Sequence, residues 1–394
     1  METLLSKLTS AGTVSSSEAQ RVVLADDSTL HELEAAERSL LCSSTPDLQR
    51  FFDARDGDVD KAFAMASANI SWRASTRPLM IASDAVPSIA SGWWRFAGYS
   101  RTGMPVLSIQ TKHLQLGDFG GDIAAYARFV AYFTEVNVGR MVPGQTKAVI
   151  LFDMSGYKPS QATPFALRAV KKLISLLGDQ HPERLGYGIV VSAPAVFHLI
   201  YKAVKRNLDP VTQKKIVFAK TSHDLARIIP SSLLSEGYGG THAEYPSPTG
   251  GVRDEIAAQR ATLAALLAGG GDGGSLPLDA LDMLSRLYRA AGGSSKSAEE
   301  IASLYARHGG SAAKVASLIA ALRKKYGDAE VDAATAASNA ALCAALRGEA
   351  GAARARAATD DAAVEALAAN DDELVEEDGG ASAAAVEAAF DHDE

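Results

Sequence analysis

The sequence is poor in cysteine, in long apolar runs and in the motifs that mark common enzymes. Its 394 residues include two cysteines, Cys42 and Cys343, whose wide separation gives neither a disulfide framework nor a metal-binding pair. The strongly apolar runs, such as 148–152, are far shorter than the roughly 20 residues that a membrane helix needs. The opening residues also lack the apolar core of a secretory leader. We therefore expect a cytoplasmic protein that is only transiently peripheral to membranes.

Enzyme motifs are absent as well. No G-x-x-x-x-G-K-[ST] loop, H-E-x-x-H pair or G-x-S-x-G elbow occurs, and the eight histidines are scattered without ligand spacing. Gly269, Gly271 and Gly274 satisfy G-x-G-x-x-G, but they follow a helical pattern and not a strand, so a linker is the better interpretation. The sequence therefore predicts that the protein is not an enzyme and has no catalytic residue, no metal site and no cofactor.

Charge is distributed unevenly along the chain. The net charge is −8, yet the segment from Ala357 onward holds 13 acidic residues and no Lys or Arg. Without that segment 34 acidic residues face 39 basic ones, which is a net charge of +5. A mildly basic body is compatible with an anionic partner such as a membrane surface, and we expect no nucleic acid partner.

What the sequence does contain is a helical beginning followed by alternating strand and helix patterns. Residues 1–27 are polar and expected to be flexible, and residues 28–90 show capped helical patterns typical of a small bundle. In residues 91–245, β-rich runs alternate with helical stretches. The β-rich runs are 104–110, 148–153, 187–192 and 216–219, and the helical stretches are 123–138, 164–177 and 195–207. This alternation predicts an α/β fold with a mostly parallel sheet.

Composition changes again after residue 245. We expect a linker with a helix over 246–275, a helical module of unknown role over 276–327, and a largely disordered, Ala-rich and acidic tail over 328–394. In the module the pair Leu287-Tyr288 recurs as Leu304-Tyr305, which indicates two related helix-turn units. Tyr288, Leu304 and Tyr305 either form the core of this module, which we favour, or bind a protein partner.

One predicted helix, residues 195–207, is both amphipathic and basic. Ile200 belongs to its apolar stripe, and Lys202, Lys205 and Arg206 lie together on another face. Such a helix can touch an anionic bilayer, with about 1 kcal/mol for each basic residue near the surface. It can also be an ordinary surface helix whose stripe packs on the sheet, and periodicity alone favours this second interpretation.

An ordered series of motifs resembles a known family. The series is HPERLG at 181–186, LDPVTQKKIVF at 208–218 and IIPSSLLSEGYGG at 228–240, preceded by LQRFFDARDGDVDKAFAMASANISWR at 48–73. This order is similar to that of the CRAL-TRIO lipid-binding family, and the phosphatidylinositol-transfer-protein branch is the most similar. The resemblance covers about residues 28–245, because the N-terminal stretch resembles the helical module that precedes this domain.

The resemblance implies a sheet floor and helical walls that enclose an apolar cavity for one lipid, with a mobile gate helix. It implies that residues 195–207 form the gate and that five of them dock on membranes: Phe197, Ile200, Lys202, Lys205 and Arg206. It also implies ligand-binding roles for Glu183, Lys215, Lys214 and Arg55, with Glu183 and Lys215 at an inositol-phosphate headgroup. The sequence departs from the family at Asp53 and Asp56, where headgroup-binding members carry basic residues.

We therefore expect reversible binding of one phospholipid, phosphatidylinositol or phosphatidylcholine, and its transfer or presentation between membranes. The acid at Asp56, which would repel a phosphate, motivates an alternative: a carrier of a retinoid, a tocopherol or a sterol-like ligand. A further alternative is a scaffold that senses lipid and recruits a protein through its C-terminal module.

Overall fold

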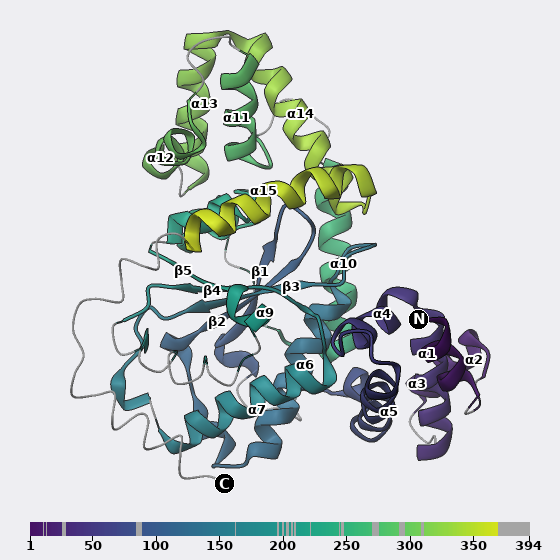
Figure 1. Cartoon of the computed structure of the whole chain (residues 1–394). Coiled ribbons are helices and arrows are strands. Elements are labelled where there is room, and N and C mark those ends of the chain that lie inside the picture. The colour runs from purple at the N-terminus through teal and green to yellow at the C-terminus, as the bar shows by residue number, and fades with distance from the viewer. Residues whose placement is uncertain are drawn as a thin grey trace.

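The computed structural model describes the chain from residue 1 to residue 368 with internal gaps. The residues outside the description are 11, 13, 26–28, 84–88, 162, 195–196, 199–200, 202–204, 206–207, 209, 221, 244, 246–247, 270–275, 291–295, 309–310 and 369–394. A central sheet carries helices on both faces, an N-terminal group of helices lies at one side, and a C-terminal group stands above the sheet (Figure 1).

The sheet has five strands in the order β1-β2-β3-β4-β5. Its strands are β1 (Trp94–Tyr99), β2 (Pro105–Gln110), β3 (Ala148–Asp153), β4 (Leu185–Val191) and β5 (Ile216–Ala219). β1 pairs antiparallel with β2, and the other pairs are parallel. The prediction of an α/β fold with a mostly parallel sheet is confirmed.

Strand β1 is the one that the sequence patterns did not indicate. Its register shifts between Phe96 and Gly98, and Gly98 adopts a positive φ of 123°. A Cβ atom at Gly98 would lie 2.0 Å from the carbonyl oxygen of Leu233, so only glycine fits this close approach. The bulge breaks the regular alternation by which strands are found in sequences.

The two faces of the sheet are covered by different helices. We call one the α15 face, because α15 (Ala350–Ala368) packs against it together with the C-terminal helices. We call the other the α7 face, because α6 (Ile123–Gly139) and α7 (Pro164–Gln180) pack against it. Thr163 caps α7 by accepting a hydrogen bond from the amide of Ala166 at 3.1 Å, and Pro164 opens its first turn.

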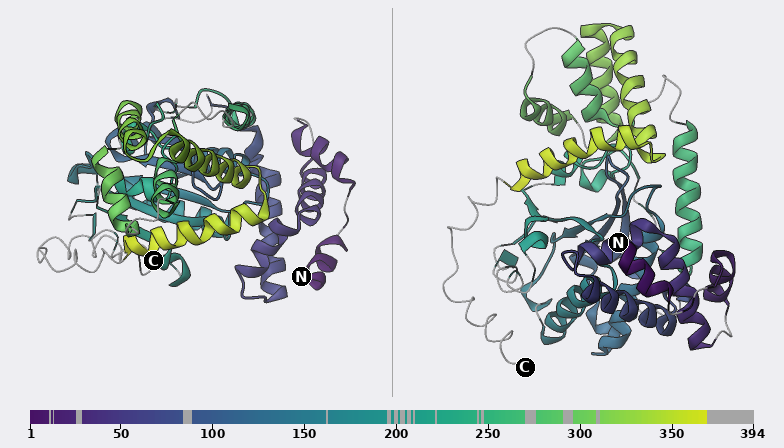
Figure 2. Two further views of the ribbon diagram at one scale, coloured as in Figure 1. Left: turned by 90° about the horizontal axis from the view of Figure 1, so that it is seen from above. Right: turned by 45° about the vertical axis from the view of Figure 1, so that its right-hand side comes forward.

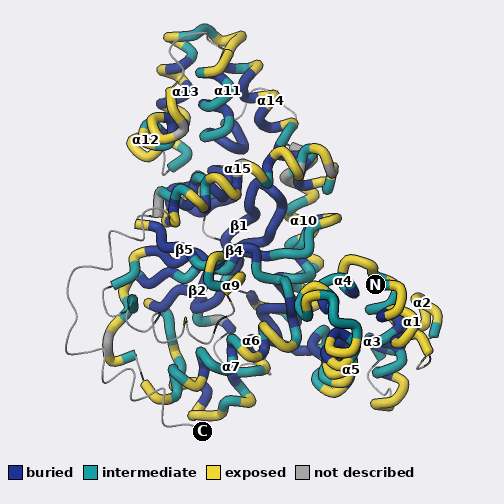
Figure 3. Tube along the Cα trace, in the orientation of Figure 1, coloured by how far each residue is buried: buried dark blue, intermediate teal, exposed yellow. Residues whose placement is uncertain are grey.

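Burial differs between these faces even on the central strand β3. Val149 and Leu151, which point to the α15 face, are both 0% exposed. Ile150 and Phe152, which point to the α7 face, are only half-buried. Figure 3 shows the sheet as the most buried part of the chain, with exposure rising toward the outer helices. At β3, the α7 face is thus the less completely covered side of the sheet.

The N-terminal group is helical from its first residues. It comprises α1 (Glu2–Thr9), α2 (Ser16–Leu24), α3 (Leu30–Ser43), α4 (Thr45–Asp53) and α5 (Val59–Thr76). Where the sequence indicated a flexible segment over 1–27, the structure has α1 and α2, because Leu4 and Leu8 are 0% exposed and pack with Phe51 of α4. The few apolar residues of α1 and α2 pack against the other N-terminal helices. This packing stabilises two helices that are too short to form alone in water.

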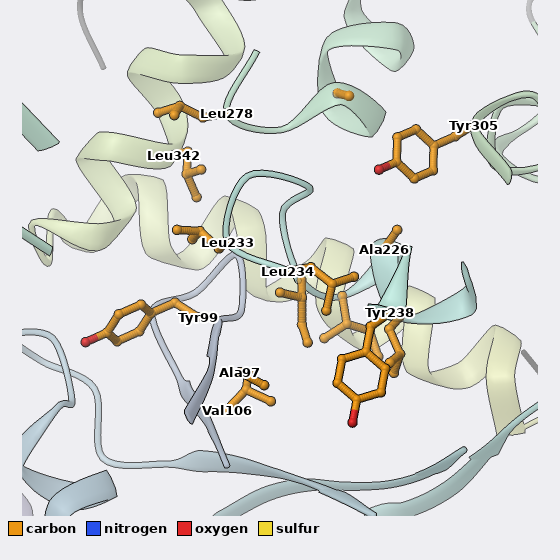
Figure 4. Close-up of a cluster of buried hydrophobic side chains, with 14 of the residues drawn as sticks. Ala97, Tyr99, Val106, Ala226, Leu233, Leu234, Tyr238, Leu278, Tyr305 and Leu342 are labelled. Atoms are coloured by element: carbon orange, nitrogen blue, oxygen red, sulfur yellow. The ribbon is translucent and has the colours of Figure 1, made fainter. Parts of the chain in front are cut away.

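The C-terminal group forms one core with the sheet. It comprises α10 (Val252–Gly269), α11 (Ala280–Ala290), α12 (Ala298–His308), α13 (Ala312–Tyr326) and α14 (Asp328–Leu346), followed by α15. Figure 4 shows Leu278 and Leu342 of this group above Leu233 and Val106, all within one apolar cluster. The right view of Figure 2 places α15 between the sheet and helices α11 to α14.

The structure differs from the expected disordered tail over most of the segment after residue 328. Val331, Leu342, Leu346 and Leu367 are buried at 0 to 1% exposure, which explains why α14 and α15 form. Because small Ala side chains separate these buried residues, the segment is only weakly apolar, and we expected disorder. Ala is nevertheless the residue with the highest helix propensity. Residues 369–394 lie outside the described part.

Tyr305 is 1% exposed, and its hydroxyl donates to the carbonyl of Gly239 at 3.0 Å. Tyr288 and Leu304 are half-buried and pack against the same core. These three residues therefore serve as core.

Candidate headgroup and lipid site

The motif His181-Pro182-Glu183-Arg184 forms a tight turn between α7 and β4. The amide of Arg184 donates to the carbonyl of His181 at 3.3 Å, which closes the turn. Pro182 occupies its second position, and Glu183 at the third has a φ of 55°. A proline followed by a residue with positive φ is the pattern of a type II turn, in which the third position is normally glycine. Glu183 holds this conformation despite its side chain.

Glu183 and Lys215 form an ion pair across the start of two neighbouring strands. The Nζ atom of Lys215 lies 3.3 Å from Oε2 of Glu183, and the two side chains are 16% and 34% exposed. Lys215 directly precedes β5, and its carbonyl accepts a hydrogen bond from Gly188 of β4 at 2.8 Å. Parallel pairing of β4 with β5 thus brings together the two residues that the resemblance assigned to a headgroup. Lys214, next to them, is exposed.

Arg55 lies on the turn that follows α4. Its Nη1 atom donates to the neighbouring carbonyl of Ala54 at 2.9 Å, and the side chain is half-buried. The adjacent Asp56 is exposed and has a positive φ of 51°. None of the interactions described for Arg55 joins it to the pair of Glu183 and Lys215. Its part in ligand binding stays a prediction.

The N-terminal helices hold the turn from outside. Arg50 of α4 donates through Nη1 to the carbonyl oxygen of Pro182 at 2.7 Å, and Asn69 of α5 donates through Nδ2 to the carbonyl of Gln180 at 2.9 Å. Asp47 lies between Arg50 and Arg184, with Oδ1 3.0 Å from Nη2 of Arg50 and 2.5 Å from Nη2 of Arg184. No sequence pattern indicates these contacts, because the i,i+3 pair of Asp47 and Arg50 on α4 does not reveal a partner more than a hundred positions away.

Burial and neighbouring charges shift the pKa values of the charged groups around this turn. Burial disfavours the charged form of Asp47, but Arg184 and the hydroxyl of Ser44 outweigh burial and lower the pKa of its carboxyl. Burial and the like charge of Arg184 lower the pKa of Arg50 to about 10. Both groups therefore stay charged at neutral pH, and their pairing persists there.

A second, deeper group of charges lies behind the turn. Arg73 of α5 donates to Glu37 at 2.9 Å and to Glu135 of α6 at 2.8 Å. Nε2 of His181 lies 3.8 Å from the Glu135 carboxylate, and its ring meets the ring of Trp72 edge-on at 5.7 Å. Burial lowers the pKa of His181 to about 4, so the imidazole is neutral at pH 7. This group joins the N-terminal helices to α6 and α7.

The predicted gate helix lies partly outside the described residues. Ile200, Lys202 and Arg206 are not described, whereas Phe197, His198, Tyr201 and Lys205 are helical. The rings of Phe197, His198 and Tyr201 lie 6.4, 4.7 and 5.2 Å from the ring of Phe218 on β5. Lys205 is exposed. The described part of this segment therefore covers the β5 end of the α7 face through aromatic contacts.

Part of the α7 face bears apolar side chains that are incompletely buried: Ile150, Phe152 and Ile216. Leu107, Ile109 and Val190 on the same face are 2 to 5% exposed. Gly188 lies between Ile150 and Ile216 in the register of the sheet and contributes no side chain at all. Incompletely covered apolar side chains at neighbouring positions of one face can form part of a binding surface.

Residues 92–240 match the family model described as the CRAL/TRIO domain. This part of the chain is a CRAL/TRIO domain. The resemblance predicted from the motifs is thereby confirmed. The site described above lies within this domain, except for the N-terminal helices that support the turn.

Individual relatives of the CRAL/TRIO domain carry different names. The Phosphatidylinositol transfer protein CSR1 of Eremothecium gossypii is 28% identical over 218 residues, 51% of this chain and 49% of that protein. The Alpha-tocopherol transfer protein-like protein of Pongo abelii is 31% identical over 102 residues, 26% of this chain and 30% of that protein. The crystal structure of Sfh5 aligns with a TM-score of 0.47 at 14% identity, over 67% of this chain and 97% of that one. The chain thus spans about half the length of the first relative and about a third of the second.

Two sequence expectations concern absent features. Within the described ranges, every helix is too short or too polar to cross a bilayer. No group of three or more His, Cys, Asp or Glu residues is placed to hold a metal ion, again among the described residues. The expectations that the protein is not an enzyme and needs no cofactor other than a bound lipid stay predictions.

Proposed function

We propose that the CRAL/TRIO domain binds one phospholipid, with the acyl chains against the α7 face and the headgroup at Glu183 and Lys215, and transfers or presents it between membranes. The observation that supports this most is the contrast on β3, where Ile150 and Phe152 are half-buried while Val149 and Leu151 are 0% exposed. Incompletely covered apolar side chains beside a glycine can form an apolar surface, here called the floor, against which acyl chains pack.

The energetics of lipid solvation require such a floor. Burying a methylene group gains about 0.8 kcal/mol, so two acyl chains of about 15 carbons represent on the order of 20 kcal/mol. A carrier must replace the bilayer with an apolar enclosure and still open at the membrane. Among the described residues of the gate, Phe197, His198 and Tyr201 contact the ring of Phe218, and these contacts would part when the gate moves.

The charges of the site fit a sugar phosphate headgroup. Lys215 supplies a half-buried cation for a phosphate, and Glu183 supplies carboxylate oxygens that accept hydrogen bonds from hydroxyl groups. The two residues pair with each other at 3.3 Å, and a headgroup would exchange that pair for its own contacts. The exposed Lys205 and Lys214, with Val211 at 59% exposure on α9 (Pro210–Lys214), would meet an anionic membrane surface.

The first test is the ligand itself. Protein purified from cells and extracted with organic solvent should yield about one lipid molecule per chain by mass spectrometry, because an empty apolar floor in water is unfavourable. Phosphatidylinositol or phosphatidylcholine is the expected species. A tocopherol, retinoid or sterol in its place would establish the alternative carrier, which the name of the Pongo relative favours. Finding no lipid at all would contradict both.

The second test separates headgroup from tails. Lys215→Ala should reduce phosphatidylinositol transfer between vesicles about tenfold, because the inositol headgroup would use both members of the Glu183–Lys215 pair. It should change phosphatidylcholine transfer less than about twofold, because choline has no hydroxyl groups for this pair to hold. Lys214→Ala is the matched control: it removes an equal charge from the adjacent, exposed position that would meet the membrane, so it should affect the transfer of both lipids alike. An equal loss for both lipids in Lys215→Ala would rule out the headgroup assignment.

A further inference from the structure

The left-handed conformation of Glu183 needs an explanation. A φ of 55° at a residue with a side chain costs about 1 to 2 kcal/mol in an isolated chain, and such residues persist where their surroundings impose them. A turn with proline in second place is also compatible with the type I form, in which the third residue has negative φ. Something in the structure therefore selects the type II form.

The selecting contact is the hydrogen bond from Arg50 to Pro182. The two turn forms differ mainly in the central peptide, whose carbonyl oxygen points in nearly opposite directions. In this turn that oxygen belongs to Pro182, and Nη1 of Arg50 donates to it at 2.7 Å. A change to the type I form would rotate the oxygen away and leave a buried guanidinium without this acceptor, which is unfavourable.

Arg50 is itself held in place on both sides. Its side chain is 11% exposed, and Nε and Nη2 donate to Asp47 at 3.3 and 3.0 Å. Asp47 also pairs with Arg184, the residue that directly follows Glu183. The turn is thus fixed at its central peptide and at its last residue by one buried cluster on α4.

From this geometry we infer that Arg50 is a positioning residue for the headgroup site. It holds Glu183 in the left-handed conformation that aims its carboxylate at Lys215, although Arg50 has no described contact with either side chain. Through Arg50, the N-terminal helices would therefore influence which headgroup the domain binds. This inference rests on the proposed function where it concerns lipid preference, and on the turn alone where it concerns Glu183.

The experiment compares Arg50→Met with Arg73→Met. Arg73 is a matched control, because it is also buried and paired with acids on neighbouring helices but donates to Glu37 and Glu135 and not to the turn. Arg50→Met should lower the ratio of phosphatidylinositol to phosphatidylcholine transfer about tenfold, as Lys215→Ala does. Arg73→Met should lower the thermal midpoint at least as much and leave that ratio within about twofold.

A double variant shows whether Arg50 acts through Glu183. In a Glu183→Gln background, Arg50→Met should cause no further change in the transfer ratio, because the carboxylate that it positions is already gone. A further loss of several fold would contradict the inference. If Arg50→Met does not fold, Arg50→Lys replaces it. A single ammonium cannot serve both Asp47 and Pro182 with the same fork, so the ratio should still fall. An unchanged ratio in Arg50→Lys, while Lys215→Ala lowers it, would overturn the inference.

A structure of the Arg50 variant separates this inference from the proposed function. In Arg50→Met, Glu183 should move to a negative φ, and its carboxylate should leave hydrogen-bond distance of Lys215. A turn unchanged from the present one would refute the positioning role, whatever lipid the protein carries. A changed turn with an unchanged transfer ratio in both Arg50→Met and Lys215→Ala would keep the positioning role and remove the headgroup function.

Discussion

The two faces of the sheet are formed by the same strands, but their side chains differ in how completely they are buried. On the α15 face the apolar residues are sealed, and polar groups are paired within the protein: the hydroxyl of Tyr238 donates to Asp153 at 2.8 Å and lies 3.0 Å from Ser108. On the α7 face, the aliphatic residues around Gly188 are half-buried. A strand can thus contribute to stability through one set of residues and offer a binding surface through the next.

The α15 face also contains a buried ionic cluster that ties the C-terminal helices to the sheet. Arg101, between β1 and β2, donates through Nε to Asp279 at 2.7 Å, with the two side chains 3% and 0% exposed. Arg356 of α15 approaches the same carboxylate at 3.4 Å. Burial disfavours a charged Asp279, but Arg101 and Arg356 outweigh it and lower the pKa of the carboxyl. Asp279 thus stays charged and paired beneath the C-terminal helices.

The largest effect should follow from breaking that cluster. Asp279→Ala leaves two buried guanidinium groups without their carboxylate, which should lower the free energy of unfolding by about 3 to 5 kcal/mol in urea titrations. Asp328→Ala is the control. It removes a 77%-exposed partner of Arg323 and should cost less than about 1 kcal/mol. A loss below about 1 kcal/mol in Asp279→Ala would contradict the idea that the C-terminal helices are tied down in this way.

The two sides should also respond to pH in opposite directions. On the α7 side, burial lowers the pKa of His181 to about 4; the unfolded chain then binds more protons, so stability falls as pH drops from about 6.5 to 4. On the α15 side, burial raises the pKa of Asp360 to about 7; the folded chain then binds more protons, so stability falls as pH rises from about 4 to 7. At about 1.4 kcal/mol per pKa unit, each contribution is about 3 to 4 kcal/mol.

Single replacements separate these opposing contributions. His181→Gln should remove the fall toward acid, and Asp360→Asn should remove the fall toward neutral pH. Urea titrations between pH 4 and 8 measure both slopes. Wild-type slopes retained in both variants would show that neither group is responsible.

Neighbouring residues on β3 give the smallest but most direct comparison. Leu151→Ala on the α15 face should cost about 3 kcal/mol, because it creates a cavity in a sealed core. Ile150→Ala on the α7 face should cost only about 1 kcal/mol, because the side chain is half-buried. Ile150→Trp should keep the protein folded and reduce co-purified lipid severalfold, since the ring would occupy the floor. Equal losses of stability for the two alanine variants would remove the distinction between the faces.

Much of the fold was accessible from the sequence, for reasons visible in particular residues. Strands β2 to β5 were predicted, because apolar runs such as Ala148–Asp153 are bounded by polar or turn residues. Matched motifs assigned Glu183 and Lys215 to one headgroup site, but their ion pair, which forms at the start of parallel neighbouring strands, was not predicted. The role of Arg50 could not be predicted, because its acceptor is a backbone oxygen 132 positions away, and no side-chain pattern marks a backbone partner. The buried role of α15 was missed because Val364 and Leu367 are sparse anchors among alanines.

The order in which the chain is synthesised gives the shared core of the sheet and α15 a consequence in the cell. Strand β5 ends at Ala219, but the helix that seals this side ends at Ala368. At roughly 5 to 20 residues per second, a ribosome needs on the order of 10 to 30 seconds to make the intervening stretch. During that time a finished sheet would expose an uncovered apolar face to solvent. Nascent chains of this protein should therefore engage general chaperones until α15 has emerged.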